Sequence, residues 1–152
     1  MKIIISCTIV ITSVLAFSFS ASAKEVEKEV LFKLSGGRFI TVAPQGKVII
    51  SSKEDLGRQR FTLIDLNGGT LEEGDKVKVR YVSPESPKAT FWQCESGELT
   101  RNYTGTEFKL RKQSDKYQFE IGGGKFVAIA RDDKSLESGK SETSAMKVDI
   151  VE

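Results

Sequence analysis

An internal repeat constrains the fold of this chain more than any other feature. Residues 32–65 align without a gap on residues 119–152, and eight of the 34 aligned pairs are identical. The clearest match is GGRFITVA at 36–43 with GGKFVAIA at 123–130. A repeat of this length indicates that one supersecondary unit is used more than once.

A third, more divergent copy lies between these two. Each copy begins with an apolar triplet of period two, the pattern of a half-buried strand. The triplets are Val30, Phe32 and Leu34; Val77, Val79 and Tyr81; and Tyr117, Phe119 and Ile121. The copies therefore span roughly residues 28–70, 71–113 and 114–152.

Each copy is predicted to contain four short strands. In the first copy we expect strands at about residues 30–34, 39–43, 47–51 and 60–65, with glycine, proline, serine and aspartate at the joints. No segment has helical periodicity with capping residues. Three copies give twelve strands, which predicts an all-β fold of the β-trefoil type, in which six strands close a barrel and three hairpins cap one end. Closure would remove the exposed sheet edges.

Two segments resemble the fascin-like branch of the β-trefoil proteins. They are the run LEEGDKVKVR at 71–80 and the run GKFVA at 124–128, which is followed by a turn and two short strands. The resemblance covers the chain after residue 23 and implies a single trefoil domain. Fascins bundle actin through four such domains, so actin bundling is not expected here. The Gln-x-Trp repeat of ricin-type lectins, the disulfides of plant inhibitor trefoils and a basic heparin patch are missing.

Residues 1–23 are predicted to be a cleaved signal peptide, so we expect a secreted or periplasmic protein. Met1-Lys2 is a basic start, residues 3–19 are apolar or small, and Ala21-Ser22-Ala23 matches a cleavage site. The alternative is an uncleaved anchor, although the apolar stretch is short for a membrane span. Cleavage would leave one domain, residues 24–152, with no membrane span.

The composition excludes several classes of function. The chain has no histidine, which excludes Ser-His-Asp and Cys-His catalysis and histidine-ligated metal sites. Residues 24–152 carry 22 basic and 21 acidic side chains, so nucleic acid is not an expected partner. Adjacent carboxylates in turns usually point apart, so the acidic pairs at 54–55, 72–73 and 132–133 do not indicate catalysis or a metal site. We expect no enzyme activity, no cofactor and a monomer.

Two conspicuous side chains are interpreted as part of the core. Trp92 takes the place of Ile40 in the first copy, and Cys94 takes that of Val42. These are inward positions of a second strand, so Trp92 is expected to be buried and Cys94 to be buried and inert. As the single cysteine after residue 23, Cys94 has no partner for a disulfide within the chain.

Two surface segments are the candidate binding sites. Arg101, Asn102 and Tyr103 offer a planar cation, an amide and an aromatic face, which together suit a sugar or a peptide. Asn102-Tyr103-Thr104 also has the spelling of a glycosylation acceptor. The insertion at 83–88 is stiffened by two prolines, and its Pro84, Glu85 and Pro87 are the candidate contacts to a protein.

These observations predict a non-catalytic binding module that recognises a glycan or an extracellular protein. Carbohydrate recognition is the leading hypothesis, and it rests on analogy between folds. The alternatives are a secreted inhibitor or protein-interaction module that acts through residues 83–88, and a structural adhesion component. A concave site that joins residues 101–103 would favour a small ligand, whereas a protruding, ordered 83–88 segment would favour a protein target.

Overall fold

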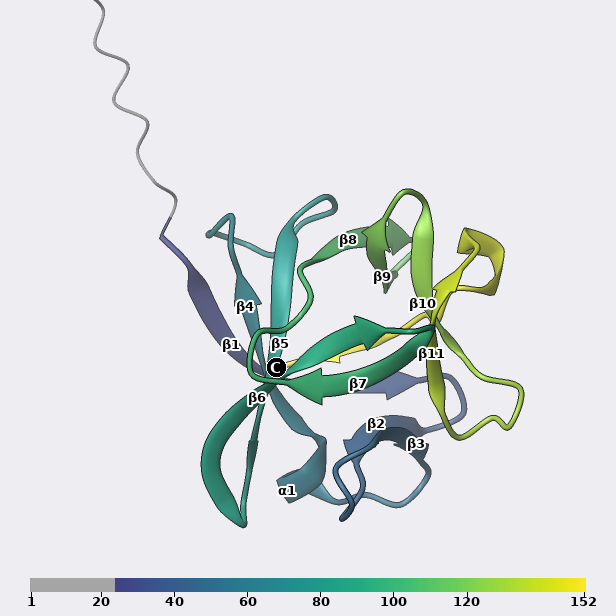
Figure 1. Cartoon of the computed structure of the whole chain (residues 1–152). Coiled ribbons are helices and arrows are strands. Elements are labelled where there is room, and N and C mark those ends of the chain that lie inside the picture. The colour runs from purple at the N-terminus through teal and green to yellow at the C-terminus, as the bar shows by residue number, and fades with distance from the viewer. Residues whose placement is uncertain (1–23) are drawn as a thin grey trace, which may run out of the picture.

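The computed structural model describes residues 24–152, and the predicted signal peptide lies outside the described residues. Twelve strands make up most of this part, together with one short α-helix and one 3-10 helix (Figure 1). The first six strands are β1 (Val26–Leu34), β2 (Arg38–Val42), β3 (Val48–Ser51), β4 (Arg60–Asp65), β5 (Lys76–Ser83) and β6 (Ser86–Glu95). The others are β7 (Glu98–Asn102), β8 (Phe108–Gln113), β9 (Lys116–Gly122), β10 (Lys125–Ile129), β11 (Leu136–Lys140) and β12 (Asp149–Val151).

The all-β prediction is confirmed, and the four strands expected in the first copy form within a few residues of their predicted places. The helices were not predicted. Helix α1 (Leu56–Gln59) and the 3-10 helix η1 (Glu142–Ser144) are each a single turn. A single turn is too short to produce the periodicity by which a helix is recognised in a sequence.

The expected β-trefoil is wrong. The closed circuit of hydrogen-bonded strands has seven members, in the order β5, β6, β7, β11, β10, β9 and β8, and β8 pairs with β5 to close it. Strands β3, β2, β1 and β4 continue from β5, and β12 pairs with β1. This antiparallel barrel with attached strands is not the six-stranded barrel with three capping hairpins, and the resemblance to fascin-like domains fails with it.

The circuit of strands depends on a contact between two hairpins that are far apart in the sequence. The β6–β7 and β10–β11 hairpins join at the Glu98–Glu137 pair, where the Ser138 amide donates to the Gly97 carbonyl at 2.9 Å. Strand β12 has only three residues, and β9 contacts the segment before it through the isolated bridge of Tyr117 and Val148. The closed circuit of strands therefore includes both of these hairpins and leaves out β12.

The core of the molecule is aromatic. Trp92 is fully buried, as predicted, and packs against Phe32, Phe61, Phe108 and Phe119 with ring centroids 5.1 to 6.3 Å apart. Tilted and edge-on packing of this kind stabilises a core beyond the burial of apolar area. The first and middle copies of the repeat contribute inward triplets that are almost completely buried, which is what their period of two predicts.

Candidate functional site

Arg101 faces inward and is part of the framework of the molecule. Its Nε donates to the Gly46 carbonyl at 2.8 Å, and its Nη1 donates to Thr90 Oγ1 at 2.8 Å. The guanidinium also lies over the Tyr81 ring, 4.9 Å from its centroid. Burial lowers the pKa of Arg101 and raises the pKa of Tyr81. Arg101 therefore joins the β2–β3 turn to strands β5, β6 and β7.

Asn102 is also used within the chain. Its Oδ1 accepts hydrogen bonds from the amides of Thr104 and Gly105 at 2.9 and 2.8 Å, and from Thr104 Oγ1 at 3.1 Å. This side chain closes the turn after β7 by imitating a backbone carbonyl. Gly105 completes the turn at φ +73°, where an added Cβ would lie 2.5 Å from Phe91 Cβ.

Tyr103 is the exposed member of the predicted triplet, with 70% of its surface accessible. Arg101 and Asn102 direct their polar atoms into the fold, so the three residues do not converge on one concave site. Tyr103 is thus an isolated aromatic side chain at the surface. That Asn102 is a glycosylation acceptor stays a prediction.

The 83–88 segment is the end of a hairpin, where a loop was expected. Strand β5 continues to Ser83 and β6 begins at Ser86, so the turn consists of Pro84 and Glu85. Ser83 Oγ accepts from the Glu85 amide at 3.2 Å, and Ser86 Oγ accepts from the Lys88 amide at 3.4 Å. The hairpin projects beyond the other strands beside α1 (Figure 1). The segment is therefore ordered and protruding.

The hairpin tip is braced against α1. An added Cβ at Gly57 would lie 3.5 Å from Pro84 Cγ, so the backbone of α1 lies beside the Pro84 ring. Arg58 Nη2 donates to Glu85 Oε1 at 2.8 Å, and Arg58 also lies 3.7 Å from Asp55. These contacts fix the tip of the hairpin relative to the helix.

Helix α1 is itself held by a buried glutamine. Gln59 is fully buried, and its Nε2 donates to the Lys53 carbonyl at 2.7 Å while its Oε1 accepts from the Asp55 amide at 3.0 Å. Thr41 Oγ1 donates to the Arg58 carbonyl at 3.2 Å. A helix this short has little stability of its own, and these bonds supply it.

A cleft of about 470 Å³ opens between α1, β4 and β5. The β4–β5 ladder ends at the Thr62–Arg80 pair, and the two strands separate from that point. Leu56 and Val82, which are 45% and 47% exposed, form apolar walls, and Glu29, Arg60 and Arg80 line the base.

The charges of the cleft differ in how firmly they are paired. Arg80 donates to both carboxylate oxygens of Glu27, at 2.9 and 2.6 Å. Arg60 lies 3.6 Å from Glu29, and both of these side chains are largely exposed. A bidentate pair has fixed geometry, whereas a single long contact at the surface contributes little. Arg80 is therefore fixed, and Arg60 is free to bind another acceptor.

The cleft residues were not singled out in the sequence, although one signal was present. Lys78 and Arg80 occupy outward positions of β5, and Val82 is the next outward position along the strand. Val82 is apolar, so it departs from the pattern of β5, in which inward residues are apolar and outward residues are polar. Leu56 and Arg60 carried no such signal, because α1 was not predicted.

Cys94 is half-buried and free. Burial raises the pKa of its thiol to about 11, so the thiol is protonated at neutral pH. The thiolate is the reactive form of cysteine, so the inertness of Cys94 stays a prediction, whereas its expected burial is met only in part.

The acidic pair at 132–133 serves local structure. Asp132 accepts from Ser135 Oγ at 2.6 Å and from the amides of Lys134 and Ser135, and these bonds lower its pKa to about 2. Asp133 forms an ion pair with Arg38 at 2.7 Å. Among residues 24–152, no group of three or more histidine, cysteine, aspartate or glutamate side chains is arranged to hold a metal ion.

The described residues contain no helix with the length and apolarity needed to cross a membrane. Comparison with protein-family models gives no match to this chain. Comparison with curated protein sequences gives no match either.

Proposed function

We propose that this protein is a secreted or periplasmic, non-catalytic module that binds another protein through the β5–β6 hairpin and the adjoining cleft. The observation that supports this function best is the braced, protruding hairpin beside a cleft of about 470 Å³. Surface that is both rigid and partly apolar loses little entropy on binding. A partner side chain that enters between Leu56 and Val82 would cover apolar area now exposed to water.

The shape of the hairpin tip favours binding through the surface of the hairpin over inhibition of a protease in the manner of a substrate. A peptide that occupies a protease cleft as a substrate does is extended over several residues. Pro84 and Glu85 instead form a tight turn closed by the Ser83–Ser86 pair. The hairpin therefore suits contact through its outer face more than insertion of its tip into an active site.

Site-specific photo-crosslinking in the source organism tests the proposal. A benzophenone amino acid at position 82 is expected to yield a discrete crosslinked protein, and Leu56→Asp in the same chain should abolish that product. The control is the same amino acid at position 103, which is more accessible (70% exposed, against 47% at position 82) and lies outside the cleft. Identical products from both positions, or none from position 82, would count against the cleft as a binding surface.

Carbohydrate binding is a second candidate function, and the exposed ring of Tyr103 is the observation that favours it. Aromatic faces present a large rigid area to a ligand. A glycan array should then give signals that Tyr103→Ala removes and that Leu56→Asp leaves unchanged. A blank array together with a blank polysaccharide pull-down would dispose of this candidate.

A further inference from the structure

Asp65 carries a buried carboxylate oxygen that the fold does not use. The residue ends β4 and is only 3% exposed. Its Oδ1 accepts from the amides of Asn67 and Gly68, at 2.8 and 3.1 Å, and these bonds close the turn after the strand. Its Oδ2 is buried as well, and within residues 24–152 it has no hydrogen-bond partner. The turn therefore occupies one oxygen of this carboxylate and leaves the other unsatisfied.

A buried carboxylate normally has a cation or several donors around it. An ionised group that leaves water loses its hydration, and without a partner its burial is strongly unfavourable. Asp65 pairs directly with Val26 of β1 on one side and with Val77 of β5 on the other. Directly paired side chains lie on the same side of a sheet, so both lateral neighbours are apolar. A partner for Oδ2 therefore has to come from beyond the ends of these strands.

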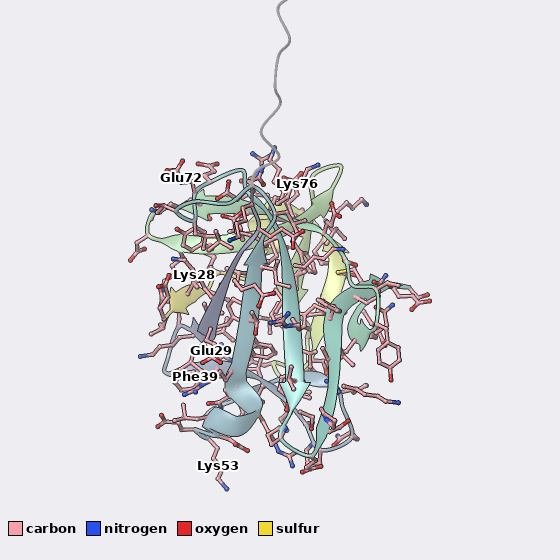
Figure 2. All side chains as sticks on the ribbon, turned by 90° about the vertical axis from the view of Figure 1, so that its left-hand side faces the viewer. Lys28, Glu29, Phe39, Lys53, Glu72 and Lys76 are labelled. Atoms are coloured by element: carbon pink, nitrogen blue, oxygen red, sulfur yellow. The ribbon has the colours of Figure 1, made fainter. Side chains whose placement is uncertain are left out.

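The described chain begins at this end of the sheet. In Figure 2 its first residues lie near the labelled Glu72 and Lys76, where β4 passes into β5. A Cβ added at Gly68 would lie 2.4 Å from the carbonyl oxygen of Lys24 and 3.7 Å from its backbone nitrogen. The amide of Gly68 is also the group that donates to Asp65 Oδ1. The backbone of Lys24 and the carboxylate of Asp65 thus lie against the same residue.

The predicted cleavage site creates a cation at this position. Signal-peptide cleavage is expected between Ala23 and Lys24. Hydrolysis of that peptide bond consumes one water molecule and leaves a carboxylate on Ala23 and an ammonium group on Lys24. In the precursor the same nitrogen belongs to an uncharged amide. Processing therefore adds a positive charge to the segment that lies against the Asp65 turn.

We propose that the α-ammonium group of Lys24, once cleavage has freed it, binds Asp65 Oδ2 and fixes the start of β1 to the end of β4. The site is a carboxylate that receives the N-terminus of its own chain. The precursor has no charge at this nitrogen, so the processed chain is the more stable form. The inference rests on the exported location in the proposed function, but it does not use the β5–β6 hairpin or its cleft.

Urea denaturation of two chains is the first test. One chain begins at Lys24, and the other keeps Ser22 and Ala23 in front of it. The shorter chain is expected to have a folding equilibrium constant about tenfold larger, because a buried ion pair contributes to stability only when both partners are present. The difference should fall below about twofold when both chains carry Asp65→Asn, which keeps Oδ1 for the turn and removes the charge. Equal stability of the two wild-type chains, as a water molecule bound to Oδ2 would give, overturns the proposal.

The pKa of the new α-ammonium group is the second measurement, and a steric effect of the two extra residues would not change it. An opposite charge favours the protonated form, so this pKa should lie about one unit above its usual value of about 8. A pH titration by ¹³C NMR of the reductively methylated terminus measures it. The titration uses the wild-type chain, so it decides the question even if Asp65→Asn does not fold. An unshifted pKa overturns the proposal.

Two exposed lysine side chains near the turn are the competing cations. They belong to Lys24 itself and to Lys76, whose amide donates to Asn67 Oδ1 at 2.6 Å. Lys24→Gln and Lys76→Gln remove these charges and keep the α-ammonium group, so each should preserve the difference between the shorter and the longer chain. Loss of the difference in either variant would assign the pairing to that side chain and overturn the proposal.

Mass spectrometry of the protein from the source organism separates this inference from the proposed function. A chain that begins at Lys24 supports the inference. A chain that begins at any other residue overturns it, whereas the crosslinking from position 82 still tests the hairpin and the cleft.

Discussion

The turn that follows β7 and the tip of the β5–β6 hairpin are both short polar segments, but they use their side chains in opposite ways. In the first, Arg101 and Asn102 bond to the backbone of the molecule and close its framework. In the second, the serines satisfy the local amides, and Val82 and Glu85 are presented at the surface. The contrast teaches that residue type alone does not distinguish a polar group that binds a ligand from one that supports the fold.

Arg101→Ala is expected to have the largest effect, a loss of about 3 kcal/mol of unfolding free energy. The change leaves the Gly46 carbonyl and the Thr90 hydroxyl without their charged donor and removes the cation over the Tyr81 ring. Urea denaturation measures it. Arg101→Lys should recover only part of the loss, since an ammonium cannot bond in the same fork. A loss below about 0.5 kcal/mol would show that Arg101 behaves like an ordinary surface residue. The turn after β7 would then not differ from the hairpin tip in its contribution to stability.

Gly105→Ala should cost about 2 kcal/mol. The backbone at φ +73° disfavours alanine, and the new methyl group would meet Phe91 Cβ at 2.5 Å. The matched control is Gly97→Ala, also at positive φ but with nothing within 4 Å of the added Cβ. Equal losses in the two variants would show that packing against Phe91 is unimportant.

Asn102→Ala is expected to cost about 1 kcal/mol, because two backbone amides lose their acceptor. Asn102→Asp keeps an oxygen in the same place, so its thermal unfolding should stay near that of the wild type. The assignment of Asn102 to the turn fails if the aspartate variant is as unstable as the alanine variant.

Glu85→Gln and Tyr103→Ala are expected to have the smallest effects, each within about 0.5 kcal/mol. The first removes one charge of the Arg58–Glu85 pair, and the second removes a ring that is 70% exposed. Chemical denaturation of the two variants compares the unfolding free energy that each exposed side chain contributes, one from the hairpin tip and one from the turn after β7. A substantial loss for Glu85→Gln would mean that the brace on α1 stabilises the whole domain.

The sequence predicted the strands well because a half-buried strand has a local pattern, the alternation of apolar and polar side chains. Phe32 and Val79 each lie within an alternating triplet, and both are almost completely buried. Trp92 was assigned to the core by its place in the repeat, and it is fully buried. The single turn of α1 is too short to show helical periodicity in the sequence, so the cleft beside it could not be predicted.

The candidate site residues were chosen from short stretches of the sequence. The prolines at 84 and 87 predicted a stiff inserted loop, whereas the structure has a two-residue turn between β5 and β6. Residues 101–103 were grouped because they are adjacent in the chain. Arg101 turns toward Gly46, which is 55 positions away in the sequence. A contact over that distance depends on how the hairpins pack, and a local pattern does not contain it.

The sequence by itself determined an all-β chain, the places of its strands in the first copy and the burial of its central tryptophan, because side-chain alternation depends only on neighbouring residues. The tertiary structure decided how the strands close. The circuit of seven strands joins two hairpins at the Glu98–Glu137 pair and closes where β8 pairs with β5, while β12 has three residues and builds no ladder with β9. Closure depends on which strand edges meet and in what register, and such pairings arise only between distant segments of the folded chain.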